Sequence, residues 1–543
     1  MAFTLSLASV WIVQASLADG LINPEATRSP VNQVFQFKQS GNFEYSVGNK
    51  VSATAYLWIP DHCCYLRGLL VLGQNVPEHM LVGHPAIREV CVANDLGIIW
   101  STPSFYSPPN KDAKKTAAFL QQLLVGLAKT SGYNEVATAP WLPIGESMHL
   151  GMVSHLLEAE PQRSIAGIYV KNAHFGCKNH ETPVLMSVGT SQEWDQEKVD
   201  IRTRWQNLSF YEMLLKEHAA FANWPVSLLV DGGSGHFECP EAMVRYFANY
   251  IAAVTKARLP AEPAKSLLPV LPENGCVAGL PLPGRDAFKP VAFAKAELPR
   301  RAMPWYFNEQ LAQAAFDLAN INWKAQTQMP AFTDSSGVPF PMLYRGITRP
   351  IPFPTETDGV TFELKGCLLP AIPTNFVAAE TPLARAPGEP SVEWVCGPVA
   401  PAGQGKFRIA LDRTWPQCPI YFAVRQKGTP NIRPVVEPGG INGFTSNSAG
   451  VPQTISFAPI PDQPAGTVTV PLRAVSDLGM PVEFFVVAGP AVVKNGSLEL
   501  TPIPPRTRFP VTVTVTAWQW GRSITPQIQT AKPVTRVFHI TEK

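Results

Sequence analysis

The sequence predicts an α/β fold with a mostly parallel sheet, followed by all-β modules. Over residues 51–257, apolar runs typical of strands alternate with stretches in which apolar residues recur at helical spacing. This alternation is typical of parallel strands joined by helices that cover both faces of the sheet. From about residue 349 the pattern changes to short β-type runs separated by Gly and Pro turns. Ligands of such α/β domains bind beyond the carboxyl ends of the strands, so functional residues are expected there.

Each strand of the first half is predicted from a short apolar run, and each helix from an amphipathic one. In the stretch 114–130, Ala117, Leu120, Leu123 and Leu127 fall on one helical face, which predicts packing on the sheet. The predicted strands are 51–59, 68–73, 96–102, 141–144, 165–170, 183–188 and 226–230. The other predicted helices are 148–158, 210–218 and 240–254. In the second half, the clearest strands are 361–364, 407–411, 420–424, 467–472, 482–487 and 511–516.

Composition limits the classes of function. The chain has 543 residues with 44 basic and 42 acidic side chains, so its formal net charge is +2. This balance argues against nucleic acid or an anionic membrane surface as the main partner, because both require a clustered basic surface. Charged residues make up 16% and hydrophobic residues 45%, which is typical of a folded protein. At about 150 residues per domain, the length predicts three or four domains.

The first residues resemble a secretory signal peptide. Residues 3–18 are apolar apart from Thr, Ser and one Gln, and the small residues Ser16 and Ala18 precede Asp19. We therefore expect an exported protein, secreted or periplasmic. No later run approaches the about 20 apolar residues that a membrane span needs. The predicted division is a signal peptide at 1–18, an α/β domain at 19–260, a connector at 261–345 with one helix (305–319) that could pack on the first domain, a β-rich module at 346–446 and a β-sandwich at 447–543.

Metal and disulfide chemistry have weak support in the sequence. His174, Cys177 and His180 have a spacing that suits a metal, but a fourth ligand is not evident, so an ordinary polar loop is expected. We accordingly predict no metal and no organic cofactor. Of the nine cysteines, those in the β-rich part could form an inter-strand disulfide if the protein is exported. These are Cys367, Cys396 and Cys418.

The segment Gly145–Ser147 carries the clearest catalytic signal. A short apolar strand runs into Gly-Glu-Ser, and a helical pattern begins directly after the serine. A serine on such a tight turn projects its hydroxyl above the sheet edge, where the N–H of Met148 and the following helix N-terminus could stabilise an oxyanion. Gly-x-Ser also occurs at 189–191 and 232–234. The motif alone therefore does not identify the nucleophile. The position of Ser147 between a strand and a helix favours it.

A serine nucleophile needs a base, and the base needs an acid that orients it. His236 follows the last predicted strand of the α/β domain, in the run Gly235-His236-Phe237, where a loop can place an imidazole over the serine. Glu193 and Asp195 follow the preceding strand, and either could orient the imidazole. The three groups then lie at the carboxyl ends of separate strands along one edge of the sheet.

These features together resemble the α/β-hydrolases of the esterase or dienelactone-hydrolase type. The resemblance rests on Tyr56–Pro60, Gly68–Asn75, the turn Gly145–Ser147 and the run Gly235–Phe237. It covers about residues 40–257, which is under half of the chain. It implies an α/β-hydrolase fold and a serine esterase that needs no metal or cofactor.

The resemblance also assigns roles to single residues. It implies that Ser147 is the nucleophile, that His236 is the base, and that Glu193 is the acid, with Asp195 as the alternative. In that family the serine comes first along the chain, then the acid and then the histidine, and Ser147, Glu193 or Asp195, and His236 follow the same order.

The family's oxyanion hole maps to the N–H of Met148 and to that of Gln74 or Asn75. One residue departs from the family pattern, because His149 stands two positions after the serine, where a small residue is usual. This departure keeps open a second function, that of a catalytically silent hydrolase fold used for binding or adhesion. No feature of the sequence excludes amide bonds in place of esters.

The spacing of the predicted strands bears on the substrate. Only about ten residues connect the strands at 165–170 and 183–188, so no helical cap fits there. The site is expected to be open unless 260–342 folds back as a lid, which favours a bulky ester, such as one carried on a polysaccharide. The sequence thus predicts an exported serine hydrolase with an ester as its partner, and it leaves the oligomeric state open.

The last module offers a further hint about partners. The run 453–540 resembles the immunoglobulin-like modules of secreted bacterial enzymes. In its stretch 511–520, Trp518 and Trp520 fall on the Thr-rich face of a predicted strand. Two tryptophans there either stack on sugar rings or pack against a neighbouring domain.

Overall fold

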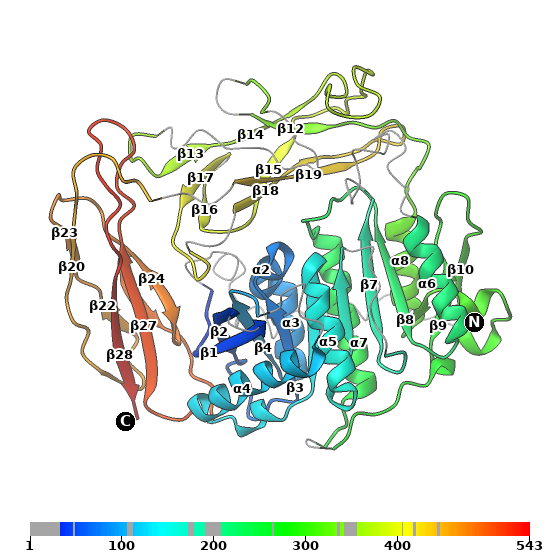
Figure 1. Ribbon diagram of the computed structural model, residues 1–543, viewed down its shortest axis with the longest axis horizontal. Coiled ribbons are helices and arrows are strands. Elements are labelled where there is room, and N and C mark those ends of the chain that lie inside the picture. The colour runs from blue at the N-terminus through cyan, green and yellow to red at the C-terminus, as the bar shows by residue number, and fades with distance from the viewer. Residues whose placement is uncertain are drawn as a thin grey trace, which may run out of the picture.

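The computed structural model describes residues 33–46, 49–105, 112–171, 179–190, 208–262, 265–333, 337–340, 356–403, 405–415, 420–441 and 446–542 (Figure 1). The predicted signal peptide lies outside these ranges. An α/β domain comes first and is followed by two β modules. The middle module lies over one end of the α/β domain, and the C-terminal module lies beside strands β1 and β2 (Figure 1).

An eight-stranded sheet forms the core of the α/β domain. Its strands lie in the order β1-β2-β4-β3-β5-β6-β7-β8. β2 runs antiparallel to both of its neighbours, and the strands from β4 to β8 are parallel. The bounds are β1 (Phe37–Ser46), β2 (Asn49–Trp58), β3 (Gly68–Gly73), β4 (Leu96–Thr102), β5 (Trp141–Glu146), β6 (Gly167–Val170), β7 (Val184–Gly189) and β8 (Val226–Asp231). Every strand predicted for this domain is present, and β1 is an additional edge strand.

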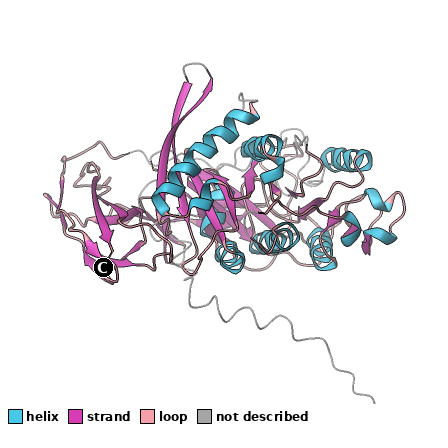
Figure 2. Ribbon diagram, turned by 90° about the horizontal axis from the view of Figure 1, so that it is seen from below, coloured by secondary structure: helices cyan, strands magenta, loops and turns pink. Residues whose placement is uncertain are grey.

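Helices cover both faces of this sheet (Figure 2). The alternation along β3 shows the two faces, because Leu70 and Leu72 share a buried cluster with α3 and α7, whereas Leu69 and Val71 share one with α4. The bounds are α2 (Val76–Gly83), α3 (Pro85–Asn94), α4 (Ala113–Ser131), α5 (Leu150–Ala159), α6 (Leu208–Ala220) and α7 (Glu241–Arg258). The α/β fold predicted from the alternation is confirmed.

Helices α2 and α3 are absent from the sequence-based prediction. Helix α2 is buried on nearly all sides, including the polar residues Glu78 and His79, so it has no solvent face to produce a 3.6-residue pattern. By contrast, α4 is amphipathic and carries both end signals. Its N-cap Asp112 accepts a hydrogen bond from the N–H of Lys115, and Gly132 ends it at a φ of +84°.

The stretch after α7 contains more structure than a connector with one helix. A three-stranded sheet, β10-β9-β11, accompanies helix α8. Two hydrogen bonds attach this unit to β8, since Tyr306 Oη donates to the carbonyl of Leu228 at 2.8 Å and Ser227 Oγ donates to that of Trp305 at 2.6 Å. The helix predicted from residue 305 begins later, because Asn308 caps it. The bounds are β9 (Cys276–Gly279), β10 (Phe288–Ala292), β11 (Trp305–Tyr306) and α8 (Glu309–Ala319).

Small sheets build the two β modules, and their strands pair antiparallel except for β21, which runs parallel to β28. The middle module has the sheets β12-β14, β13-β17-β16 and β15-β18-β19, and the C-terminal module has β20-β23, β21-β28-β27-β24 and β22-β26-β25. The middle strands are β12 (Pro330–Thr333), β13 (Thr361–Glu363), β14 (Lys365–Leu368), β15 (Ser391–Cys396), β16 (Val399–Gly403), β17 (Lys406–Ile409), β18 (Ile420–Gln426) and β19 (Val435–Ile441). The C-terminal strands are β20 (Ile455–Phe457), β21 (Gln463–Pro464), β22 (Thr469–Pro471), β23 (Ala474–Ser476), β24 (Glu483–Ala488), β25 (Ala491–Lys494), β26 (Ser497–Leu500), β27 (Val511–Trp518) and β28 (Val534–Thr541).

Arg413 of the middle module joins all three parts of the chain. Its guanidinium donates to the carbonyl of Gln33 at 2.7 Å and to that of Val487 at 2.8 Å. It also lies over the rings of Phe35 and Phe485, at 4.9 and 5.2 Å from their centroids. Burial among these groups lowers the pKa of Arg413 to about 10, because burial disfavours the charged form. The middle module is therefore held against the α/β domain and the C-terminal module by the same side chain.

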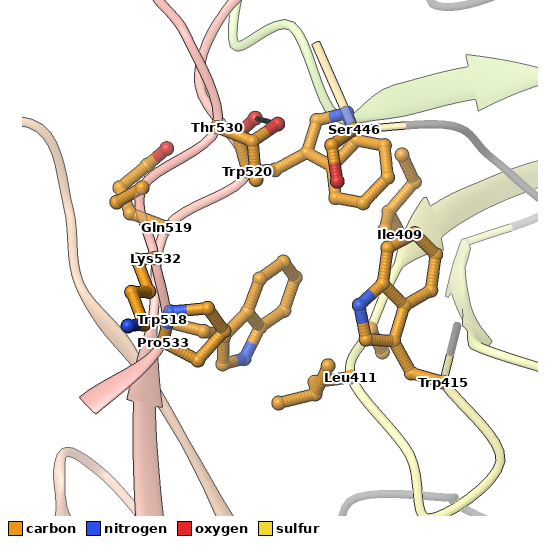
Figure 3. A pocket seen from close by; sticks show the side chains of 12 residues that line it. Ile409, Leu411, Trp415, Ser446, Trp518, Gln519, Trp520, Thr530, Lys532 and Pro533 are labelled. Atoms are coloured by element: carbon orange, nitrogen blue, oxygen red, sulfur yellow. Dashed lines mark hydrogen bonds between the residues drawn. The ribbon is translucent and has the colours of Figure 1, made fainter. Parts of the chain in front are cut away.

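The two tryptophans of the C-terminal module pack against the middle module. Trp518 is 4% exposed and Trp520 is 3% exposed, and both belong to a buried cluster with residues of the middle module. Trp415 meets Trp520 edge to face, with ring centroids 5.0 Å apart. A cavity of about 200 Å³ lies between Trp518 and Trp520 of the C-terminal module and Trp415, Ile409 and Leu411 of the middle module (Figure 3). Trp518 and Trp520 therefore pack between domains, which is one of the two roles expected for them from the sequence.

Two further expectations are only partly covered by the structure. Cys367 is a free thiol and Cys418 lies outside the described residues, so the inter-strand disulfide stays a prediction. Within the described ranges, none of the helices is both long enough and apolar enough to cross a bilayer.

Candidate functional site

Ser147 stands on a strained turn directly after β5. Its φ is +52°, a left-handed conformation that non-glycine residues rarely adopt. Gly145 makes the turn possible, because a Cβ at this position would lie 2.6 Å from the carbonyl oxygen of His149 and 2.9 Å from a methyl group of Val153. The short helix η2 (Ser147–His149) and then α5 follow at once. This strand, turn and helix form a nucleophile elbow, which exposes a serine hydroxyl at the carboxyl edge of a sheet.

The structure brings Ser147 and His236 together. His236 lies in the loop after β8, and its Nε2 is 2.9 Å from Ser147 Oγ. Ser147 is 7% exposed and His236 is 5% exposed, so little water competes for this hydrogen bond. Proton transfer from a serine to an imidazole requires such a distance.

The predicted acids Glu193 and Asp195 lie outside the described residues. The nearest described residue on that side is Thr190, directly after β7. Its hydroxyl accepts a hydrogen bond of 2.7 Å from the N–H of Gly233, in the loop that carries His236. The segment that contains both candidate acids therefore starts beside the histidine loop, and the choice between Glu193 and Asp195 stays a prediction.

The sequence-based prediction missed Glu146, the middle residue of Gly-Glu-Ser. Its carboxylate is fully buried, and Oε1 lies 3.0 Å from Nε2 of His236. The amide of Asn75 donates to the Glu146 carbonyl at 3.0 Å and to the other carboxylate oxygen. An acidic residue at the end of the otherwise apolar run Trp141–Glu146 is the signal that could have found it, since a buried carboxylate needs specific partners.

His149 is accommodated in its crowded position because Gly73 leaves space for its ring and Glu78 pairs with it. Its Nδ1 lies 3.2 Å from Oε1 of Glu78, which is fully buried on α2. The same oxygen of Glu78 accepts a hydrogen bond of 2.8 Å from the N–H of Glu146. Gly73 provides the space, since a Cβ there would lie 3.3 Å from Nδ1 of His149. The bulky residue is therefore built into the elbow.

The residues predicted to form an oxyanion hole lie at the ends of two neighbouring strands. Gln74 and Asn75 follow β3, and Met148 follows β5. The hydrogen bond from the Asn75 amide to the Glu146 carbonyl holds the 74–75 segment against the elbow. The side chain of Gln74 is occupied elsewhere, because its Oε1 accepts a hydrogen bond from the hydroxyl of Thr102.

The strand order, a serine elbow after β5 and a histidine after β8 are the defining arrangement of one fold. The first domain has the α/β-hydrolase fold. No protein-family model and no curated protein sequence matches the chain.

Solved structures with a similar fold match only the α/β-hydrolase part. Poly(aspartic acid) hydrolase-1 from Sphingomonas sp. KT-1 is 12% identical and covers 40% of this chain and 99% of its own, with a TM-score of 0.27. The siderophore hydrolase EstB from Aspergillus nidulans is 12% identical and covers 41% of this chain and 96% of its own, with a TM-score of 0.28. The poly(3-hydroxybutyrate) depolymerase LpqC from Bordetella parapertussis is 11% identical and covers 44% and 97%, with a TM-score of 0.26. The fold of this domain is established by its own strand order and elbow.

A buried ion pair lies beneath the histidine loop of the hydrolase domain. Lys171, which follows β6, is fully buried, and its ammonium lies 2.9 Å from the carboxylate of Asp231 at the end of β8. Ser234 donates a hydrogen bond to the same carboxylate and contacts the ammonium. Because Ser234 precedes His236 by two residues, this cluster fixes the start of the loop that positions the imidazole.

The middle module forms one wall of the hydrolase site. Tyr421 of β18 packs on Phe237, with ring centroids 5.2 Å apart, and the N–H of Val436 donates to the carbonyl of Gly233 at 2.8 Å. Arg425 of β18 pairs with Glu238, and burial raises the pKa of Glu238 to about 7 even though this guanidinium opposes the rise. The site is therefore less open than the short 171–183 connection predicts, because residues of 420–441 cover part of it, and Ile321 of the 260–342 stretch lies against Gly232 at the start of the histidine loop.

The metal-like spacing falls mostly outside the described residues, which include His180 but not His174 or Cys177. His180 stacks on Phe221 with centroids 3.7 Å apart, and its Nε2 lies 2.7 Å from Glu217. Across the described ranges, no group of three or more His, Cys, Asp and Glu side chains could hold a metal ion.

Proposed function

We propose that this protein is a serine hydrolase that cleaves carboxylic esters. The observation that carries the proposal is the 2.9 Å hydrogen bond between Ser147 and His236 on a strained elbow. Neither a positive φ at a serine nor a buried serine–imidazole pair is needed for folding, whereas nucleophilic catalysis uses both. This pairing weighs against the alternative of a silent fold used for binding or adhesion.

In the proposed reaction, Ser147 Oγ attacks the ester carbonyl while Nε2 of His236 takes the hydroxyl proton. The N–H groups of Met148 and of Gln74 or Asn75 stabilise the oxyanion. The imidazolium gives its proton to the departing alcohol, which leaves an acyl-enzyme. Water, deprotonated by His236, then attacks the acyl carbon, and the proton returns to Ser147 as the acid is released.

The role of the acid is assigned to Glu193, or else to Asp195. A carboxylate on the other ring nitrogen of His236 fixes the tautomer that accepts the serine proton and stabilises the imidazolium. The pairing of Thr190 with Gly233 supports this assignment, because it brings the start of the 190–195 segment beside the histidine loop.

Ester and amide bonds are distinguished by a pair of substrates with the same acyl group. We expect the full chain to hydrolyse a short-chain nitrophenyl ester with a burst of about one nitrophenol per active chain, since the acyl-enzyme forms before it is hydrolysed. The matched nitroanilide should react far more slowly. Faster cleavage of the anilide would make the protein an amidase, and a folded chain that cleaves neither substrate would remove the enzyme proposal.

We further propose that the ester is carried on a carbohydrate. The cavity of about 200 Å³ that the half-buried Trp415 lines supports this, because an indole face binds sugar rings and flat ligands, whereas Trp518 and Trp520 are packed between the modules (Figure 3).

Replacing the half-buried Trp415 with alanine tests the carbohydrate proposal. The KM for an acylated oligosaccharide should rise about 2- to 10-fold, which corresponds to the loss of one aromatic contact. The KM for the nitrophenyl ester should stay unchanged, and this substrate is the internal control. An equal change for both substrates, or none for either, would contradict a sugar site in the cavity.

Export stays a proposal, and N-terminal sequencing of the mature protein tests cleavage before Asp19.

A further inference from the structure

Glu146 shares one nitrogen of the imidazole with the proposed nucleophile. Its Oε1 lies 3.0 Å from Nε2 of His236, and Ser147 Oγ lies 2.9 Å from the same atom. The orienting acid of a serine hydrolase instead contacts the opposite ring nitrogen, Nδ1. Glu146 therefore cannot take the place of the predicted acid, and its contact with Nε2 needs an explanation of its own.

The surroundings of Glu146 fix its carboxylate in this position. The amide of Asn75 donates both to the Glu146 carbonyl and to its carboxylate, and the N–H of Glu146 donates to Glu78. The carboxylate is fully buried, so water does not offer it an alternative partner. Turning it away from His236 would break the bond to Asn75 and leave a buried charge with one partner fewer.

The chemistry of Nε2 defines what this carboxylate does. When His236 accepts the proton of Ser147, the imidazole becomes a cation whose Nε2 lies 3.0 Å from Oε1 of Glu146, which is the distance of an ion pair. Before the transfer, the lone pair of Nε2 faces the same negative charge, which is unfavourable. The carboxylate thus compensates the positive charge that forms on the imidazole during attack, and this attraction is strong where water is excluded.

We propose that Glu146 is a positioning residue that holds His236 against Ser147 and stabilises the imidazolium formed during attack. This inference rests on the proposed function. Removing the charge of Glu146 should therefore change both the rate of acylation and its dependence on pH.

Other charged groups surround His236, and the test has to separate Glu146 from them. On the elbow side lie Glu78 and His149, and on the histidine loop lie Glu238 and Cys239. The pair Lys171–Asp231 lies at the start of the histidine loop, and Arg425 of the middle module forms an ion pair with Glu238 of that loop. Glu193 and Asp195 belong to a segment outside the described residues. Glu78 is the matched control, because it is equally buried and contacts the elbow but pairs with His149.

The experiment measures the rate of Ser147 acylation by a nitrophenyl ester against pH for Glu146→Gln, Glu78→Gln and the unchanged chain. We expect the acid limb of Glu146→Gln to move about one pH unit toward lower pH, as removal of an adjacent opposite charge does, and the plateau rate to fall several-fold. Glu146→Asp keeps the charge but draws it back from the imidazole by one methylene, so its acid limb should move in the same direction by a smaller amount. Glu78→Gln should leave the acid limb in place.

An acid limb that does not move in Glu146→Gln, or that moves equally in Glu78→Gln, would overturn the inference. If Glu146→Gln does not fold, Glu146→Asp decides, because its carboxylate lies one methylene further from the imidazole and should shift the acid limb part of the way. An unmoved acid limb in folded Glu146→Asp then overturns it. If Ser147 of the unchanged chain is acylated but the pH profiles of the Glu146 variants do not move, only the role of Glu146 is refuted. If Ser147 of the unchanged chain is not acylated at all, the proposed function itself is refuted.

Discussion

Replacing Ser147 with alanine should lower kcat/KM for a carboxylic ester by about 10³-fold or more without changing thermal stability. The loss follows from the removal of the proposed nucleophile, and the fold is unaffected because the hydroxyl is one small group at the sheet edge. His236→Ala should cost a similar factor. Because the two groups act as one unit, the double variant should be little worse than either single variant.

Ser154→Ala is the matched control for these variants. Ser154 lies on α5, close in sequence to the elbow, and its hydroxyl is hydrogen-bonded to Tyr169 at 3.0 Å, away from His236. Steady-state kinetics should find this variant close to the unchanged chain. Equal activity in Ser147→Ala and Ser154→Ala would show that Ser147 is not the nucleophile.

Lys171→Met should destabilise the protein by about 3–5 kcal/mol, because the carboxylate of Asp231 then stays buried without an opposite charge. Lys171 is fully buried, and its ammonium lies 2.9 Å from that carboxylate. The double variant Lys171→Met/Asp231→Leu should recover most of the loss, since well-packed apolar residues often replace a buried ion pair without cost.

The exposed pair Lys494–Glu499 is the control for the buried pair. Its atoms lie 2.8 Å apart, but more than half of the lysine side chain is exposed, so breaking the pair should cost less than about 1 kcal/mol. Chemical denaturation of the four proteins compares the two losses. A Lys171→Met variant that loses no more stability than Lys494→Met would contradict the structural role assigned to the buried pair.

Periodicity predicted the elements that have one apolar face or one short apolar run. The strands from β2 to β8 and the amphipathic helix α4 are of this kind. Helix α2 was missed because burial on nearly all sides leaves no polar face, and β1 because its alternation is mixed with polar residues. The position of Ser147 after β5 and of His236 after β8, at the same edge of the sheet, followed from the order of strands alone, since parallel strands share a carboxyl edge.

The features that sequence patterns did not reveal depend on contacts between distant parts of the chain. Glu146 looked like the variable residue of a motif until the structure placed it beside His236 and Asn75. The cover provided by the middle module depends on packing such as that of Tyr421 on Phe237, which no local pattern encodes. Trp518 follows the alternation of β27, but the adjacent module covers the face that alternation alone would leave exposed.

Covalent labelling with a fluorophosphonate probe tests the central claim most directly, because the probe reacts only with a serine that a base has activated. The folded full chain is labelled, digested and analysed by mass spectrometry. We expect one adduct, on the peptide that contains Ser147, which is lost in Ser147→Ala and His236→Ala and retained in Ser154→Ala. An absence of labelling in the folded unchanged chain, or an adduct that persists in Ser147→Ala, would contradict the claim.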